Sequence, residues 1–274
     1  MPPLDIPFPS INPVLFSYGP FTIRWYALAY IVGILLAWFY ARAICRSEQM
    51  WGGTTPITVT DCDDFILWVT IGIIFGGGLG YVLFYNPAQF AAHPAEIVQV
   101  WKGGMSFHGG LLGVVAAVYF FSRAKGINPL SLGDIASAAT PFGLFFGRIA
   151  NFINSEVVGR VSVVPWAMVF PGAGDAPRHP SQLYEAALEG ILLFIILAVA
   201  TYRYKALTRP GTIFGLFLVF YGLFRSFVEF FREPHAGHPL DIGVLTPGIV
   251  YSIPMILLGL WLIRRAQIKP ALAP

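Results

Sequence analysis

The sequence predicts an all-α polytopic membrane protein with about seven transmembrane helices. Of its 274 residues, 56% are hydrophobic and only 11% are charged, whereas a soluble domain is about 45–50% apolar and about 25% charged. So few charges cannot cover the surface of a soluble globule of this length. The apolar residues also form long runs without the two-residue alternation of membrane strands, and this favours helices over a barrel.

A helix needs about 20 mostly apolar residues to cross a bilayer. Seven segments meet this requirement: 22–42, 65–85, 108–123, 134–154, 182–202, 212–231 and 248–264. The third and seventh are short, and Pro141 interrupts the fourth. The stretch before them, residues 1–20, contains six prolines. It therefore cannot form one long helix, and we expect an arm that lies on the membrane surface.

The basic residues predict the orientation of the chain. Ten of the seventeen Lys and Arg residues fall on one side of the expected spans: Arg42, Arg46, Arg123, Lys125, Arg203, Lys205, Arg209, Arg264, Arg265 and Lys269. The positive-inside rule places that side in the cytoplasm, with the N-terminus outside and the C-terminus inside. One membrane domain, 1–274, is expected, with outer loops at about 86–107, 155–180 and 232–247. The small net charge of +3 gives no reason to expect a nucleic-acid partner.

Gly72, Gly76 and Gly80 recur every four residues in the second segment. Small residues at this spacing let two membrane helices approach closely. The row therefore predicts close helix packing.

Charged side chains within a bilayer cost at least about 2.5–3.5 kcal/mol each, so we treat them as functional candidates. The first group lies at the outer end of the fourth segment, in residues 147–160. Arg148, Asn151 and Ser155 have the spacing of one helix face. That face would present a cation and amide donors to the bundle interior. The alternative is an arginine that satisfies the end of a neighbouring helix.

The second group lies in the sixth segment. Tyr221, Arg225 and Glu229 are spaced by four residues, and Arg232 follows near the outer boundary. These residues are expected to line one stripe of the helix. A buried Arg225–Glu229 pair that only fixes packing is the alternative, since buried ion pairs are weak evidence of stability.

Two further groups contain a histidine. His108 lies in a glycine-rich stretch, residues 103–113, and can exchange a proton near neutral pH. A structural role for this histidine is the alternative. The absence of a second His or Cys nearby speaks against a metal site. Residues 179–185 resemble a helix start, in which Glu185 meets the positive end of the helix as either a cap or a functional group. Tyr26 is either an interface aromatic residue or part of the site.

These groups place arginines beside Glu, Asn, Tyr and His side chains at the depth of the outer leaflet. A guanidinium binds phosphate through two parallel hydrogen bonds, and a phospholipid headgroup is the obvious anion at that depth. The residues therefore predict binding of a phospholipid headgroup. They do not by themselves identify a reaction.

The chain resembles the prolipoprotein diacylglyceryl transferases over nearly its whole length. Residues 147–159 match the family signature G-R-x-x-N-F-x-N-x-E-x-x-G, and 108–111, 179–185 and 225–232 match further family motifs in the same order. One position departs from the pattern. Gly78 stands where the family usually has arginine.

The resemblance implies a reaction and its setting. The enzyme would transfer the diacylglyceryl group of phosphatidylglycerol to the thiol of a lipobox cysteine in a preprolipoprotein, releasing glycerol phosphate, as the first step of lipoprotein maturation. It would be a multi-pass protein of the bacterial inner membrane, in contact with the lipid bilayer, with its N-terminus and active site on the periplasmic side. No metal or organic cofactor is implied.

The resemblance also implies roles for individual residues. Arg148 and Arg225 would hold the phosphate and stabilise its charge as it leaves. A base must form the reactive thiolate; His108 is the first candidate and Tyr221 the second. Glu156 and Glu229 would orient the arginines. The remaining substrate-binding candidates are Tyr26, Asn151, Gly159, Glu185 and Arg232.

Two other classes of protein stay open at this point. A phospholipid transporter or lipid-binding module would show broken helices in paired repeats, and no such pairing is visible. A polytopic phosphatase would need a nucleophile beside a base, and no such arrangement can be identified.

Overall fold

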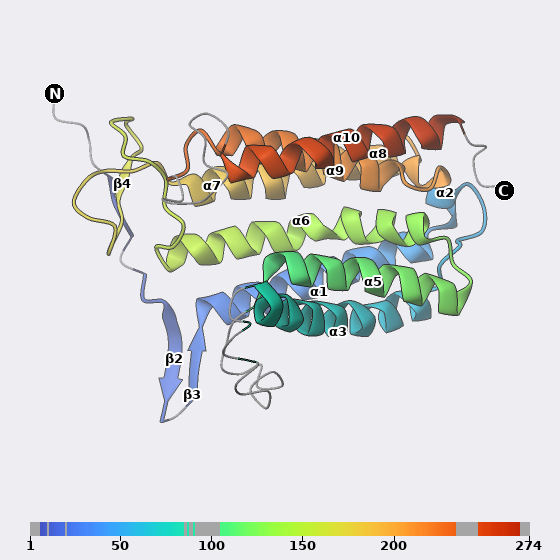
Figure 1. Cartoon of the computed structure of the whole chain (residues 1–274), viewed down its shortest axis with the longest axis horizontal. Helices are drawn as coiled ribbons and strands as arrows, with labels where there is room; N and C mark the ends of the chain where they lie inside the picture. The colour runs from blue at the N-terminus through green and yellow to red at the C-terminus, as the bar shows by residue number, and fades with distance from the viewer. Residues whose placement is uncertain are drawn as a thin grey trace. The chain divides into compact units, whose positions relative to one another are not determined.

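The computed structural model describes residues 6–9, 11–19, 21–84, 87, 90, 105–233 and 246–268, and most of these are helical (Figure 1). The helices are α1 Trp25–Arg46, α2 Glu48–Trp51, α3 Val59–Phe84, α5 Phe107–Lys125, α6 Pro129–Ile153, α7 Ser181–Glu185, α8 Leu193–Tyr202, α9 Thr212–Val228 and α10 Pro247–Ile268. A π-helix, η3 Ala186–Leu192, joins α7 to α8, and a short 3-10 helix, η4 Ala206–Thr208, precedes α9. All seven expected segments are therefore helical, with ends shifted by a few residues.

Five helices within the described residues are long and apolar enough to cross a membrane: Trp25–Arg46, Val59–Phe84, Phe107–Lys125, Ser181–Tyr202 and Pro247–Ile268. Thr212–Val228 is a shorter apolar helix. The expectation of a helical, polytopic membrane protein agrees with this finding, whereas the count of seven spans and the orientation of the termini stay predictions. Most of the expected outer loops 86–107 and 232–247 lies outside the described residues; the loop 155–180 is described.

The chain divides into two compact units, Met1–Ala41 with Asp134–Ala273, and Arg42–Gly133. We call them the first and second units. The single membrane domain expected from the sequence stays a prediction.

Close packing of α3 and α5 dominates the second unit, as the glycine row predicts. A Cβ placed on Gly72 would lie 2.5 Å from the carbonyl oxygen of Gly113, and one on Gly80 would lie 2.8 Å from the Cα of Gly109. Only glycine lets the two backbones approach so closely. Gly78 differs, because no atom lies within 4 Å of a Cβ placed there.

The N-terminal arm belongs to the first unit, and its described residues contain short strands and no long helix, in agreement with its prolines. β1 (Ile6–Pro7) pairs in parallel with β4 (Met168–Val169), and β2 (Val14–Tyr18) forms a hairpin with β3 (Phe21–Arg24). The Phe8 ring packs against Phe152 and Phe170, with centroid distances of 5.2 and 5.4 Å. The arm is thereby attached to the end of α6. Its expected position on a membrane surface stays a prediction.

A buried carboxylate sets the level of α9 against α6. Asp134, near the start of α6, accepts hydrogen bonds from the backbone N–H of Gly211 at 2.7 Å and of Phe214 at 2.8 Å. It thereby satisfies donors that the first turn of α9 leaves without intrahelical partners. Arg148 lies 14 residues after Asp134, and Arg225 lies 14 residues after Gly211. At about 1.5 Å per residue, both arginines reach the same level, roughly 21 Å along the helices.

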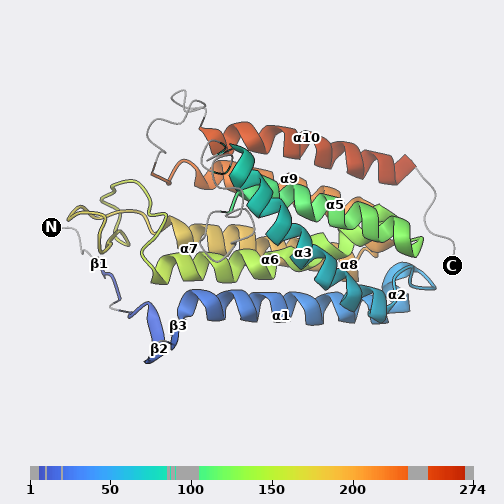
Figure 2. The ribbon, with the colours of Figure 1, turned by 60° about the horizontal axis from the view of Figure 1, so that its bottom comes forward.

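α10 lies beside α9 in both views (Figure 1 and Figure 2). Gly215 and Gly259 allow this contact, because a Cβ on Gly259 would lie 2.6 Å from the Gly215 carbonyl oxygen. α10 therefore covers the side of α9 that carries Glu229 at its end.

Candidate functional site

Six charged side chains of the first unit come together at the ends of its helices. We call this group the arginine–glutamate cluster: Arg148, Glu185, Glu189, Arg225, Glu229 and Arg232. Arg148 comes from α6, Glu185 from α7 and Arg225 from the last turn of α9. The helix packing described above therefore determines where these charges meet.

Glu185 is the centre of the cluster. Its side chain is only 1% exposed, and its Oε2 lies 2.5 Å from Arg148 Nε. Its Oε1 lies 2.5 Å from Arg232 Nη1 and 3.9 Å from Arg225 Nη1. One buried carboxylate thus contacts three arginines, which a helix cap alone would not do.

Glu229 supplies the second carboxylate and pairs with Arg225, as their spacing predicts. Its Oε2 lies 2.6 Å from Arg225 Nη1, one helical turn earlier, and 3.8 Å from Arg232 Nε. The carboxylate rests against the first turn of α10, where a Cβ on Gly248 would lie 2.5 Å from Oε2. A negative charge is favoured at that positive end of the helix.

Glu189 completes the cluster and was not among the expected residues. Its side chain is fully buried, and its Oε2 lies 3.6 Å from Arg148 Nη2. A signal for it was present in the sequence, because Glu185 and Glu189 are four residues apart in an otherwise apolar segment. The cost of a membrane-embedded charge applies to Glu189 as it does to Arg148.

The cluster has no net formal charge, and its ion pairs involve only some of the guanidinium nitrogens of Arg148 and Arg225. Three arginines face three glutamates, so the formal charges cancel. Within the described part of the chain, ion pairs occupy Nε and Nη2 of Arg148 and only Nη1 of Arg225. The side chains of Arg148 and Arg225 remain 21% and 15% exposed. The remaining nitrogens are suited to an anion with several oxygens.

The loop after α6 differs from expectation. The helix ends at Ile153, and Ser155 has a positive φ of 56°. The expectation that Ser155 shares a helix face with Arg148 is therefore wrong. Asn151 remains on the helix, and its Nδ2 donates to Glu156 Oε2 at 3.1 Å, while Asn154 Nδ2 donates to Oε1 at 3.3 Å. Glu156 thus has amide partners here, and its expected role in orienting arginines stays a prediction.

Gly159 lies where three backbone segments meet. Its N–H donates to the His179 carbonyl at 3.1 Å, and it pairs with Arg232 in an antiparallel bridge. A Cβ at this position would lie 2.6 Å from the Phe231 carbonyl oxygen. Arg160 adds a hydrogen bond from Nε to the Arg232 carbonyl at 2.8 Å. The structure thus gives Gly159 a packing role that holds Arg232 in place.

The motif at 179–185 connects this loop to the cluster, and a helix begins at Ser181 as predicted. Ser181 Oγ donates to the Val157 carbonyl at 3.1 Å, and Gln182 Nε2 donates to the Glu156 carbonyl at 2.6 Å. Both side chains are buried. They fix the start of the helix that carries Glu185.

His179 lies outside the candidate spans and is predominantly neutral near pH 7, because burial lowers its pKa. The Tyr184 hydroxyl accepts a hydrogen bond from Trp166 Nε1 at 2.6 Å and lies 3.0 Å from His179 Nδ1. The hydroxyl can donate to Nδ1 or accept from it, and the tautomer of His179 decides which.

Three further expected residues are Tyr221, Tyr26 and His108. Tyr221 stacks on Phe217 one turn before Arg225 and interacts electrostatically with Arg148. Tyr26 in α1 lies with its hydroxyl 3.2 Å from that of Tyr30. His108 belongs to the second unit, where it is exposed on the first turn of α5. The first unit thus brings together the expected Arg148, Glu185, Tyr221, Arg225, Glu229 and Arg232.

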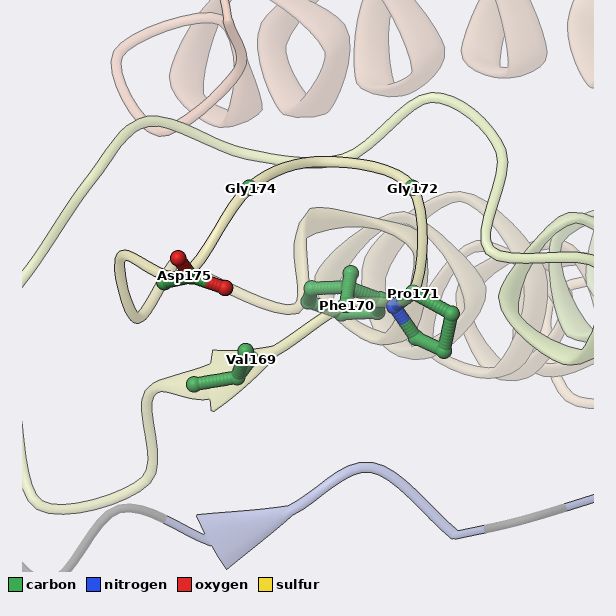
Figure 3. Close-up of a pocket in the computed structure, with 6 residues that line it drawn as sticks. All are labelled: Val169, Phe170, Pro171, Gly172, Gly174 and Asp175. Carbon is green, nitrogen blue, oxygen red and sulfur yellow. The ribbon is translucent and has the colours of Figure 1, made fainter.

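A hollow of about 450 Å³ lies outside this cluster, in the loop after β4 (Figure 3). Its lining residues are Val169, Phe170, Pro171, Gly172, Gly174 and Asp175. Asp175 is the one charged residue among them, so this hollow does not match the predicted site. Among the described residues, no three His, Cys, Asp or Glu side chains are arranged to hold a metal ion.

Comparison with known proteins assigns a family. The family model described as prolipoprotein diacylglyceryl transferase matches residues 13–265. The phosphatidylglycerol–prolipoprotein diacylglyceryl transferase of Nitrobacter winogradskyi is 59% identical over 265 residues, which cover 96% of this chain and 91% of the relative. The enzymes of the same name from Rhodopseudomonas palustris and Agrobacterium fabrum are 56% and 53% identical, over 100% and 96% of this chain and 97% and 94% of the relatives. The resemblance found in the motifs is confirmed.

The geometry predicts that Glu185 holds the cluster together. Glu185→Gln leaves three arginines with two carboxylates, and removing the buried partner of an ion pair costs about 3–5 kcal/mol. Unfolding in detergent should show a loss of this size. Glu233→Gln is the matched control, because Glu233 pairs with Arg178 at 3.0 Å but is 49% exposed, and exposed pairs contribute only about 0–1 kcal/mol. Equal losses in the two variants would contradict the central role of Glu185.

Proposed function

Because the chain belongs to the prolipoprotein diacylglyceryl transferase family, we propose that the arginine–glutamate cluster holds the phosphate of phosphatidylglycerol during diacylglyceryl transfer. The protein is a transferase that moves this group from phosphatidylglycerol to a prolipoprotein, as its relatives are named. The observation that carries the site assignment is the pair of partly exposed arginines. Buried carboxylates fix Arg148 and Arg225 while some of their nitrogens stay available.

The acceptor in this proposal is the thiol of the lipobox cysteine of a preprolipoprotein. Its thiolate sulfur attacks the glyceryl carbon that bears the phosphate oxygen. A carbon–sulfur bond forms, the carbon–oxygen bond breaks, and glycerol phosphate leaves with the bonding electrons. The phosphate therefore gains one negative charge in the step. Fixed guanidinium groups stabilise such developing charge without having to reorganise.

The thiol proton needs a base, since the thiolate is the nucleophile. His108 remains our first candidate, as an exposed imidazole on the first turn of α5. Tyr221 is the second, and it lies one helical turn before Arg225 on α9. Asn151, Glu156 and Tyr26 complete the proposed headgroup pocket, whereas Glu185 and Arg232 would act through the arginines they contact.

We also infer the setting of the enzyme. It would cross the bacterial inner membrane seven times, with the cluster toward the periplasm and the basic helix ends toward the cytoplasm. The common level of Arg148 and Arg225, opposite the Asp134 contact, supports a site near one face of the bilayer. The comparisons do not favour a phospholipid transporter or lipid-binding module.

The direct test is to incubate the purified protein with a lipobox peptide and phosphatidylglycerol and to follow the peptide by mass spectrometry. The peptide should gain the mass of one diacylglyceryl group on its cysteine. A cysteine-to-serine peptide should gain nothing. An unmodified cysteine peptide under conditions where a relative is active would overturn the proposal.

Arg225→Lys tests the planar grip on the phosphate. Lysine keeps the charge but loses the two-pronged geometry, and loss of one group that stabilises transition-state charge typically costs about 10²–10³ in rate. We expect a loss of this order with normal membrane insertion. Arg209→Lys, an exposed arginine before α9, should leave activity unchanged. Near-normal turnover of Arg225→Lys would exclude the assignment, and poor insertion would favour a purely structural pair.

His108→Gln tests the base. General-base help is typically worth about 10²–10⁴ in rate, so activity should fall within that range. The deficit should shrink as pH rises, because the substrate thiol then ionises without help. A deficit that does not change with pH would indicate a structural role for His108 and make Tyr221 the leading candidate.

Gly78→Arg tests the departure from the family pattern. The open space around Gly78 accommodates a side chain, and a long arginine can extend along an apolar surface toward water. We predict that this variant transfers diacylglyceryl to a lipobox peptide faster than the chain as it stands. Gly78→Ala is the control for a side chain without charge. Equal or lower activity of the arginine variant would show that the position serves packing only.

A further inference from the structure

Glu189 is a buried carboxylate to which the mechanism above assigns no role. It is fully buried, and neither side-chain oxygen has a hydrogen-bond partner among the described residues. A buried carboxylate without hydrogen bonds is costly. Four residues away, Glu185 carries the same charge, which adds repulsion. A side chain kept under these conditions needs an explanation beyond packing.

The local backbone brings Glu189 toward Arg148. Glu189 lies in the π-helix Ala186–Leu192, and such segments are often found at functional sites. The next residue, Gly190, allows close approach to α6, because a Cβ there would lie 2.7 Å from the Cβ of Phe145. Phe145 is three residues before Arg148 and therefore on the neighbouring turn of the same helix face.

The charges around Glu189 come from several elements. Arg148 of α6 is the nearest cation, at 3.6 Å. Arg225, Arg232 and Tyr221 act on it electrostatically from α9 and the turn that follows, and Glu185 acts from α7. The one ion pair that Glu189 makes within the described residues is therefore the one with Arg148.

Arg148 is held by two carboxylates at two nitrogens. Glu185 Oε2 lies 2.5 Å from Nε, and Glu189 Oε2 lies 3.6 Å from Nη2. Glu185 also serves Arg225 and Arg232, so it cannot by itself fix the plane of one guanidinium. Two contacts on different nitrogens define that plane and leave Nη1 for a ligand.

We propose that Glu189 is a positioning residue that fixes the guanidinium plane of Arg148 for the phosphate of phosphatidylglycerol. This inference rests on the proposed function, because it takes Arg148 to be a phosphate-binding group. It adds a residue that acts through Arg148 rather than on the substrate.

The test compares Glu189→Gln with the unaltered enzyme in steady-state assays in which each substrate is varied in turn. Gln keeps the shape of the side chain but removes the charge that holds Nη2. We expect kcat/KM for phosphatidylglycerol to fall about 10–100-fold, since misplacing a binding group by about 1 Å can cost 10²-fold. The KM for the lipobox peptide should not change. The thermal midpoint in detergent should fall less than in Glu185→Gln, because Glu189 contacts one arginine at 3.6 Å whereas Glu185 contacts three. Glu233→Gln, an ion-pair carboxylate outside the cluster, should match the unaltered enzyme throughout.

The double variant Arg148→Lys with Glu189→Gln separates positioning from a general effect. If Glu189 acts only through the guanidinium of Arg148, the double variant should lose no more activity than Arg148→Lys alone. Additional loss in the double variant, or equal loss for both substrates with a thermal midpoint as low as that of Glu185→Gln, would overturn the inference.

Failure of this inference can be told apart from failure of the proposed function. Normal kinetics in Glu189→Gln with impaired Arg148→Lys would reject Glu189 and keep the phosphate site, whereas normal kinetics in both would reject the site itself. Glu189→Asp keeps the charge but is too short to reach Nη2, so the same loss specific to phosphatidylglycerol is expected. If neither Glu189 variant folds, the residue is structural and the proposal is wrong.

Discussion

The sharing of one buried carboxylate, Glu185, among three arginines is the interaction on which the rest of this structure depends. Charges at membrane depth are tolerated only when they are paired, and the pairing partners come from different helices. The contacts of Glu185 with Arg148 and Arg232 therefore constrain where α6, α7 and the end of α9 can lie. Removing any one of these elements would leave a buried charge without a partner.

Several residues outside the arginine–glutamate cluster help to position its side chains. Asp134 sets the level of α9 against α6 through the backbone of Gly211 and Phe214. Gly248 leaves room for the Glu229 carboxylate, and Gly159 leaves room for the segment that carries Arg232. In each case a small or capping residue permits a close approach that a larger side chain would prevent.

The balance of charge is compatible with both the stability of the cluster and the anion binding that we propose for it. Three arginines and three glutamates cancel in the absence of substrate, so a buried net charge is avoided. The glutamates nevertheless occupy only some of the guanidinium nitrogens of Arg148 and Arg225. In the site we propose, an arriving phosphate would find donors that are already oriented, which is the condition for electrostatic stabilisation of a charge that develops during the reaction.

Sequence reasoning predicted what depends on local spacing. The helices follow from apolar runs, the Arg225–Glu229 pair follows from a separation of four residues, and the packing of α3 on α5 follows from the glycine row. It did not find Glu189 or the central position of Glu185, because their partners lie on other helices and one sequence does not show which faces meet. It also placed Ser155 on the face of α6, although Ser155 lies past the end of the helix with a positive φ, which a residue other than glycine rarely adopts.

The arginine–glutamate cluster is proposed to receive the phosphate of phosphatidylglycerol. An experimental structure of the protein with phosphatidylglycerol bound would test it most directly. We expect phosphate oxygens within hydrogen-bond distance of Arg148 Nη1 and of Arg225, while Glu185 keeps its contacts with the arginines. A phosphate bound away from both arginines, with the cluster unchanged, would contradict it.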